Sequence, residues 1–261
     1  MTAICWNNVD SAFMRTNIPL LPQEVDFLCL TKVDFSCILT MNAFLRRLVT
    51  KHINALTFDE CIMTYVGFAS VLCELNYHVT KILAFRKCRA DDSVCMQLVV
   101  YGGDEMSQLD LSSNPITSYG LTCLAHLHLD SLDVSLCKCV KGFNDWCKLF
   151  GNVKRTLKLA GCFHENLQSF HEACEQLSGG EWTLDELDLS YNSLGYNEIS
   201  KLLYAMRNAK IGKLCIKGVL DEQSAVALVG PSVFYKKLVM DYYENVCVDK
   251  EVVERINQLK I

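Results

Sequence analysis

The sequence predicts an α/β fold built from repeated strand–turn–helix units. The clearest unit begins at Leu187-Asp188-Leu189, where two leucines two positions apart face the same side of a short strand. Asn192 follows at the turn, where a polar side chain can satisfy backbone groups. Apolar residues then recur at helical spacing from Ile199 to Met206. Each unit should therefore contribute one strand and one helix.

The same pattern recurs along most of the chain. Leu109 to Asn114 is a second copy with asparagine, and four further copies carry cysteine at that position, namely Cys61, Cys88, Cys137 and Cys162. With weaker copies included, about nine units begin at residues 33, 56, 83, 109, 132, 157, 187, 214 and 238. Helices are expected near 117–127, 141–150, 164–177 and 196–208. The four cysteines should be reduced thiols packed in the core.

This Leu-x-Leu-x-x-Asn/Cys pattern resembles the leucine-rich repeat family, and the helix-length second half of each unit looks like the ribonuclease-inhibitor-like subclass. The resemblance covers roughly residues 30–250. It implies a curved solenoid with parallel strands on the concave side and helices on the convex side. We predict an N-terminal cap at 1–30, the solenoid at 31–248 and a C-terminal capping helix at 249–261. A docking arm for a partner is the alternative for residues 1–30.

Composition favours a chain that works inside the cell. The net charge is −5 and the 25 basic residues form no runs, so nucleic acid and anionic membrane are not expected partners. Met1 to Val9 lacks the positive charge of a secretory signal, and the uncharged stretches are too short or too polar to span a membrane. The 15 cysteines fit buried repeat positions better than a disulfide scaffold. The predicted location is the cytoplasm.

Known enzyme signatures are missing from the sequence, including phosphate loops, dinucleotide loops, the nucleophile elbow and His-Glu-x-x-His. Two groups of residues contain metal-ligating side chains: Cys137, Cys139 and Cys147, and Cys162, His164, His171 and Cys174. Neither has the paired spacing of a zinc site. We therefore predict no catalytic residues, no cofactor and no metal.

The predicted function is a non-enzymatic scaffold that binds a partner protein through its concave face. Its expected contact residues lie between and beside the paired leucines, or at the adjacent turns, namely Asp110, Asp133, Lys158, Trp182, Glu186, Asp188, Tyr191, Lys213, Lys217 and Lys237. The acids fall in the middle of the array and Lys213, Lys217 and Lys237 near its C-terminal end. A polar face needed only for solubility would show similar residues. Trp182 and Tyr191 are the expected aromatic anchors, although the Trp182 indole could instead pack on a helix end.

Three other functions remain open at this stage. A structural subunit of a cytoskeletal or ciliary assembly fits the same features. A ubiquitin-ligase substrate receptor would need an adaptor-binding motif, and no F-box-like segment precedes the repeats. A RanGAP-type GTPase-activating protein is built on the same repeat subclass and uses a loop arginine. Its counterpart here would be Arg86 or Arg89, but the threonine-glycine-arginine loop and acidic tail of that family are absent.

Overall fold

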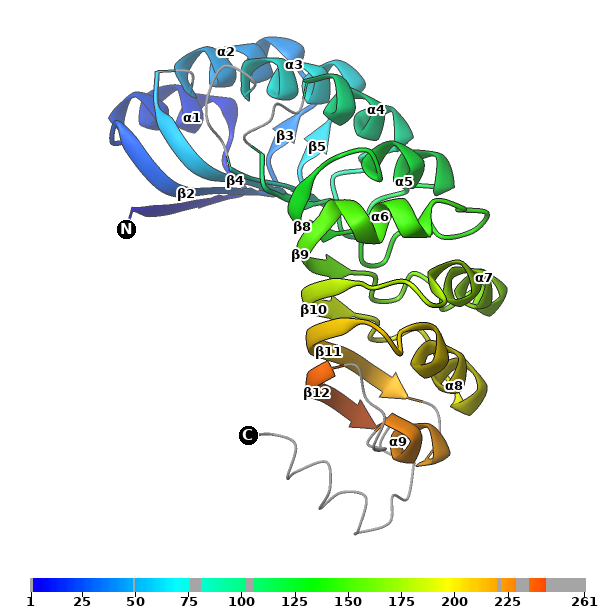
Figure 1. Ribbon diagram of the computed structural model, residues 1–261. Helices are drawn as coiled ribbons and strands as arrows, with labels where there is room; N and C mark the ends of the chain where they lie inside the picture. The colour runs from blue at the N-terminus through cyan, green and yellow to red at the C-terminus, as the bar shows by residue number, and fades with distance from the viewer. Residues whose placement is uncertain are drawn as a thin grey trace. The chain divides into compact units, whose positions relative to one another are not determined.

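A computed structural model describes residues 2–48, 50–75, 81–101, 106–219, 222–228 and 235–242 (Figure 1). They belong to two compact bodies, the N-terminal body of residues 1–129 and the C-terminal body of residues 130–261. In each body parallel strands alternate with helices, which confirms the predicted α/β class. No helix among the described residues is long and apolar enough to cross a membrane.

The N-terminal body holds a parallel array in the order β1-β2-β4-β6-β7. Its strands are β1 (Ala3–Asn7), β2 (Glu24–Thr31), β4 (His52–Asp59), β6 (Ile82–Arg86) and β7 (Gln108–Asp110). Its helices are α1 (Ser11–Asn17), the short 3₁₀ helix η1 (Ile18–Leu20), α2 (Ile38–Leu48), α3 (Tyr65–Leu75), α4 (Asp92–Tyr101) and α5 (Ser118–Leu124). A separate pair of two-residue strands is formed by β3 (Asp34–Phe35) and β5 (Ile62–Met63).

The C-terminal body repeats this arrangement in the order β8-β9-β10-β11-β12. Its strands are β8 (Leu129–Asp133), which starts at the boundary residue, β9 (Val153–Lys158), β10 (Thr183–Asp188), β11 (Lys210–Val219) and β12 (Tyr235–Tyr242). Its helices are α6 (Trp146–Asn152), α7 (Leu167–Leu177), α8 (Tyr196–Ala205) and α9 (Glu222–Leu228). The helices lie on one side of the strands (Figure 1).

Rows of leucines mark the side of each sheet that faces the helices. In the C-terminal body the strand register aligns Leu157, Leu187, Leu214 and Leu238 on neighbouring strands, and all four are buried. In the N-terminal body the equivalent row is Leu28, Leu56, Leu83 and Leu109. Residues in register on parallel strands point to the same face, so each row forms a continuous strip of core. The opposite face of the C-terminal sheet carries mainly polar residues, whereas that of the N-terminal sheet also holds apolar ones such as Phe27, Cys29 and Ala84.

Strands leave the sheet through a turn with a left-handed backbone residue. Gly161 and Tyr191, which follow β9 and β10, have φ of 67° and 60°. Their backbone amides donate to the carbonyls of Ser190 and Lys217, one unit further along, at 2.8 and 2.7 Å. The same backbone geometry occurs at Lys32, Glu60, Lys87, Ser113 and Leu136. Each of these residues comes immediately before the Asn/Cys position, except Lys32, which precedes Val33 at the equivalent place. The turn amides that bond to the following unit therefore link consecutive units.

The Asn/Cys position is buried, as predicted. Cys61, Cys88, Cys137 and Cys162 are free thiols with at most 6% of their surface exposed. The Cys162 thiol donates to the Val134 carbonyl of the preceding unit at 3.1 Å. Asn192 fills the same role with its amide, which donates to the Leu159 carbonyl at 2.9 Å, while its Oδ1 accepts from the Phe163 amide at 2.7 Å. This position therefore joins neighbouring units through buried hydrogen bonds.

The predicted helices are present with shifted ends. The largest shift affects the segment predicted as helix at 141–150, because α6 starts only at Trp146 and buried Val140 and Phe143 lie in turns before it. The prediction that a repeat strand of the main sheet begins at Val33 is wrong. The strand that pairs with β4 is β2, whose Leu28 is in register with Leu56.

The structure describes most of the predicted N-terminal cap but none of the predicted C-terminal cap. Residues 3–31 form β1, α1, η1 and β2, so they continue the strand–helix alternation of the N-terminal body. The predicted capping helix at 249–261 lies outside the described residues.

Candidate functional site

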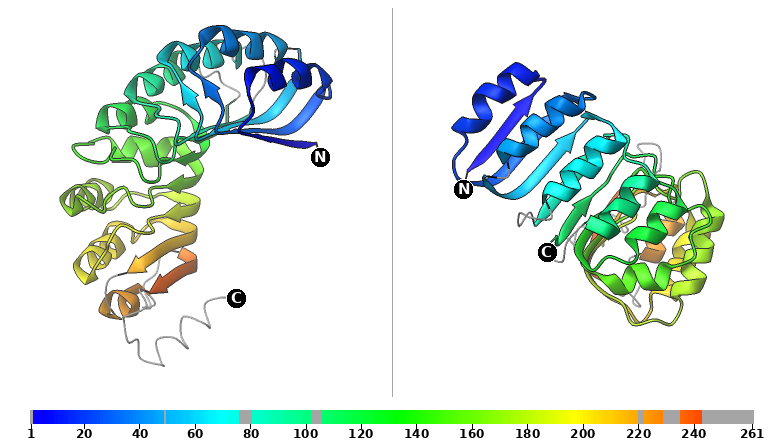
Figure 2. Two further views of the ribbon diagram at one scale, coloured as in Figure 1. Left: turned by 180° about the vertical axis from the view of Figure 1, so that it is seen from behind. Right: turned by 90° about the horizontal axis from the view of Figure 1, so that it is seen from above.

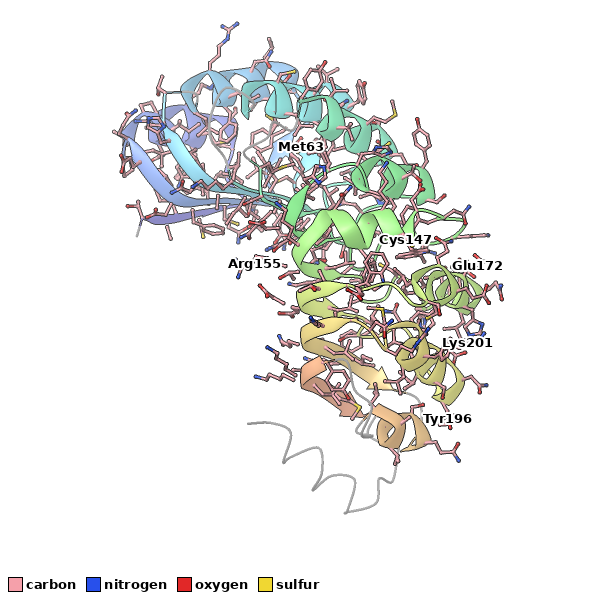
Figure 3. The ribbon with its side chains drawn as sticks, in the orientation of Figure 1. Met63, Cys147, Arg155, Glu172, Tyr196 and Lys201 are labelled. Carbon is pink, nitrogen blue, oxygen red and sulfur yellow. The ribbon has the colours of Figure 1, made fainter. Side chains whose placement is uncertain are left out.

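The polar side of the C-terminal sheet carries most of the residues predicted to bind a partner. We define the strand face as Asp133, Arg155, Lys158, Asp185, Glu186, Asp188, Lys213, Lys217, Lys236 and Lys237, all exposed or half-buried. Figure 3 shows Arg155 on the strand side of this body and Glu172, Tyr196 and Lys201 on the helix side. The strand face therefore presents charged side chains on the side of the sheet away from the helices.

Neighbouring strands pair opposite charges across this face. Arg155 Nε lies 2.8 Å from Asp185 Oδ2, Glu186 Oε1 lies 3.0 Å from Lys213 Nζ, and Asp133 pairs more loosely with Lys158. The hydrogen bond from Lys213 to Glu186 raises the pKa of the lysine. The sequence predicted an acidic middle, but most of these acids are matched by bases on an adjacent strand. Each matched pair therefore leaves little net charge on this part of the strand face.

The lysines of β12 differ from those on the inner strands. Lys236 and Lys237 are exposed, and neither forms an ion pair with any residue that the structure describes. Lys237 is in register with Lys213, whose charge is already matched by Glu186. Asp188 and Lys217 of the strand face also lack an ion pair with a described residue, but their charges are opposite, so the excess positive charge of the strand face lies on β12. We call Lys236 and Lys237 the β12 lysines.

Aspartates at the strand exits form turns in addition to carrying charge. Asp188 Oδ1 accepts the Ser190 amide at 2.9 Å, and Asp133 Oδ1 accepts the Ser135 amide at 3.0 Å. Asp110 does the same with Ser112. These carboxylates have a local structural role that explains their recurrence. The Asp-x-Ser spacing in the sequence was the signal for this role, and sequence reasoning assigned the aspartates to partner binding alone.

Two predicted residues do not join the strand face as expected. Asp110 belongs to the N-terminal body, where it forms an ion pair with Arg86. Trp182 is half-buried, donates its indole N–H to the Leu177 carbonyl at the end of α7 at 3.1 Å and packs edge-on against Phe150. The alternative that its indole packs on a helix end is thus the observed one, and Trp182 is a poor exposed anchor.

Tyr191 remains an exposed aromatic residue beside the strand face. It occupies the left-handed turn position after β10, and 49% of its surface is exposed. Three residues of the face were missed by sequence reasoning, namely Arg155, Asp185 and Lys236. Each lies two residues before the first leucine of its repeat, as Asp185 does before Leu187. At β10 the buried Leu184, just before Asp185, was the signal that the strand begins this early.

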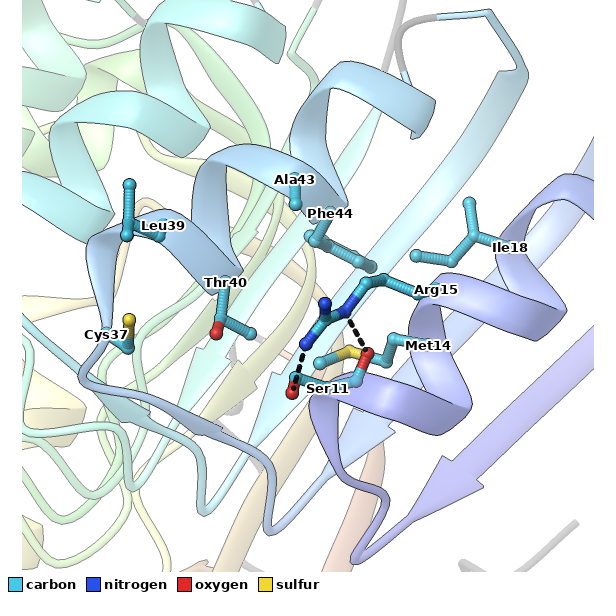
Figure 4. A pocket seen from close by; sticks show the side chains of 9 residues that line it. All are labelled: Ser11, Met14, Arg15, Ile18, Cys37, Leu39, Thr40, Ala43 and Phe44. Carbon is cyan, nitrogen blue, oxygen red and sulfur yellow. Dashed lines mark hydrogen bonds between the residues drawn. The ribbon is translucent and has the colours of Figure 1, made fainter.

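A cavity of about 300 Å³ lies in the N-terminal body between α1 and α2 (Figure 4). Met14, Ile18 and Phe44 form its buried apolar walls, and Arg15 and Cys37 lie at its exposed rim. Cys37 immediately precedes α2. Hydrogen bonds from the backbone amide and the hydroxyl of Thr40 lower the pKa of the Cys37 thiol. Among the cysteines that the structure describes, Cys37 combines exposure with a lowered pKa and is thus the one best suited to react as a thiolate.

The residues considered as metal ligands have other partners. His164 Nδ1 bonds to Ser193 Oγ at 2.6 Å, and His171 Nε2 lies 2.9 Å from Glu198 Oε1. Among the described ranges of the chain, no group of three or more His, Cys, Asp or Glu side chains is arranged to hold a metal ion.

No protein-family model matches this sequence, and the comparison with curated proteins gives no match.

Proposed function

We propose that this chain is a non-enzymatic protein-binding scaffold whose partner docks on the strand face of the C-terminal body. The observation that carries the proposal is the unmatched charge of the β12 lysines, beside strands on which three pairs of opposite charges are formed, namely Asp133 with Lys158, Arg155 with Asp185 and Glu186 with Lys213. A partner segment rich in aspartate and glutamate supplies the charge that β12 lacks. Tyr191 offers an exposed aromatic surface at the exit of β10 in the same body, and aromatic residues often contribute most of the affinity of an interface.

The proposed architecture is a leucine-rich-repeat solenoid of about nine units. Two features support it: the left-handed turn that donates to the next unit, and the buried Asn/Cys position that bonds to the preceding one. In such arrays each unit contacts its neighbours only, and the aligned strands provide an extended binding surface. We place the protein in the cytoplasm, in keeping with the free thiols at every cysteine that the structure describes.

Reversing the charge of the β12 lysines tests this proposal. The variant Lys236→Glu/Lys237→Glu should bind an acidic peptide roughly tenfold more weakly, because each reversed exposed charge changes an interaction by about 0.5–1 kcal/mol. Fluorescence anisotropy with a labelled poly-glutamate peptide measures the effect directly. Wild-type affinity should fall as salt is added, and the variant should respond less.

The matched control carries two reversals on the helix side of the same body, Lys148→Glu/Lys201→Glu. It alters net charge equally and should keep wild-type affinity. Affinity purification from cells with both variants then identifies proteins lost only when β12 is changed. Equal loss in the control, or full retention by the β12 variant, contradicts the proposed docking site.

A further inference from the structure

Strand β1 presents unpaired backbone groups at the outer edge of the N-terminal sheet (Figure 2, right). The Thr2 carbonyl accepts bonds from the amides of Asp26 and Phe27, and the Asn8 amide donates to the Thr31 carbonyl. Within a strand, alternate residues direct their N–H and C=O groups to the same side. The backbone N–H and C=O groups of Ile4 and Trp6 therefore point toward β2. Those of Ala3, Cys5 and Asn7 point outward, away from the sheet. No hydrogen bond from these outward groups to another described residue is present.

The hydrophobic core is also incompletely covered at this edge. Ile4 and Trp6 are in register with Leu28 and Leu30 of β2, so they lie on the helix side of the sheet. The two β2 leucines are 0% exposed, but Ile4 and Trp6 are only half-buried. Phe13 of α1, which packs edge-on against Trp6 at 5.6 Å, is 39% exposed. Apolar surface and open backbone groups thus coincide.

The features that usually protect an edge strand are missing from β1. Residues 1–9 contain no charged side chain and no proline. Natural sheets commonly block their edges with lysine, proline or a bulge, because an open edge pairs with other strands. A neutral edge also lacks the charge that would select a charged partner, and it does not repel a copy of itself.

We propose that β1 pairs antiparallel with β1 of a second copy of this chain, about a twofold axis at Cys5. In this register Ala3, Cys5 and Asn7 exchange both backbone hydrogen bonds with Asn7, Cys5 and Ala3 of the second copy. On the helix side, Ile4 then faces Trp6 of the second copy in each of the two equivalent contacts. The pairing satisfies the outward backbone groups and covers the half-buried apolar residues in a single isologous interface.

Substitution by proline tests the backbone part of the proposal. The Cys5 amide points away from β2, so Cys5→Pro removes an outward donor and leaves the β1–β2 bonds in place. Light scattering should give twice the chain mass of 29.5 kDa for the wild type and for Cys5→Ala, and the single mass for Cys5→Pro. A monomeric wild type at every soluble concentration, or a Cys5→Pro dimer, overturns the proposal.

Cross-linking provides a second measurement that leaves β1 unchanged. In a background of Cys37→Ser, Cys147→Ser and Cys247→Ser, a short bismaleimide should join two chains through Cys5, since paired strand residues lie about 5.5 Å apart. The same background with Cys5→Ser should give no covalent dimer. If the protein is a dimer but Cys5 does not cross-link, the interface lies elsewhere on the protein and the proposed β1 register is refuted.

Discussion

Individual side chains at the Asn/Cys position and at the helix starts have different chemistry although many are cysteines. The Cys162 thiol at the Asn/Cys position donates a hydrogen bond to the Val134 carbonyl. Two other buried cysteines lie outside this position, and burial raises the pKa of Cys174 in α7 to about 12 and that of Cys215 in β11 to about 11. At Cys37 the pKa shift has the opposite sign, because the backbone amide and hydroxyl of Thr40 donate to the sulfur. Only the thiolate is nucleophilic, so the position of each cysteine sets its reactivity.

Alkylation should therefore modify Cys37 well before Cys174 and Cys215. Thiolate fraction rises as pH passes upward through the pKa, so Cys37 reacts at a lower pH than an ordinary thiol, whereas Cys215 needs a pH near 11. Mass spectrometry of iodoacetamide-treated protein across a pH series gives each rate. Thr40→Ala removes the hydroxyl donor and should shift the Cys37 profile to higher pH. Labelling of Cys88 or Cys162 in the native protein as fast as Cys37 would contradict this description.

Strand–helix units are held to one another by the Asn/Cys position as well as by their leucines. Asn192 connects the unit of β10 to that of β9, because it bonds to the Leu159 carbonyl and the Phe163 amide. Cysteine offers a donor at the equivalent place but no comparable acceptor. Asparagine and cysteine can therefore both donate to the preceding unit at this position, but only asparagine also offers a good acceptor.

Replacing Asn192 by alanine should lower the free energy of unfolding by about 1–3 kcal/mol for each buried group left without a partner. Asn192→Cys should cost less, since its thiol can still donate to the Leu159 carbonyl as Cys162 does to Val134. Urea unfolding followed by circular dichroism measures both. Equal losses for the two variants would show that the Phe163 amide, which neither variant satisfies, accounts for the whole effect.

Element positions could be read from the sequence, whereas the assignment of polar residues to roles could not. Pairs of apolar residues two positions apart, each beginning with leucine, located β4 and β6 to β12, because a short strand with one buried face leaves a regular pattern. At β2 the leucines lie at Leu28 and Leu30, ahead of the segment chosen from sequence, and no Asn/Cys residue follows them to mark the unit. The roles of Asp188 and Trp182 depend on the Ser190 amide and the Leu177 carbonyl, which the leucine pattern does not address.

At the scale of the whole molecule, pairing through β1 makes stability depend on concentration. A dimer that dissociates on unfolding gains stability by mass action, up to about 1.4 kcal/mol for a tenfold rise in protein concentration. The melting temperature of the wild type should therefore rise with concentration. That of Cys5→Pro should stay constant, and differential scanning calorimetry over a dilution series distinguishes the two. A concentration-independent wild type would be evidence against the pairing.

The turn amides have a consequence for how local opening spreads along the C-terminal body. The Tyr191 amide, which follows β10, is held by the Lys217 carbonyl at the end of β11, and the Gly161 amide by the Ser190 carbonyl after β10. Solvent deuterium can replace an amide proton only when its acceptor has moved away. Deuterium exchange at the Tyr191 amide therefore reports on opening at the end of β11. When one strand frays, the first amide to exchange is the turn amide that follows the preceding strand.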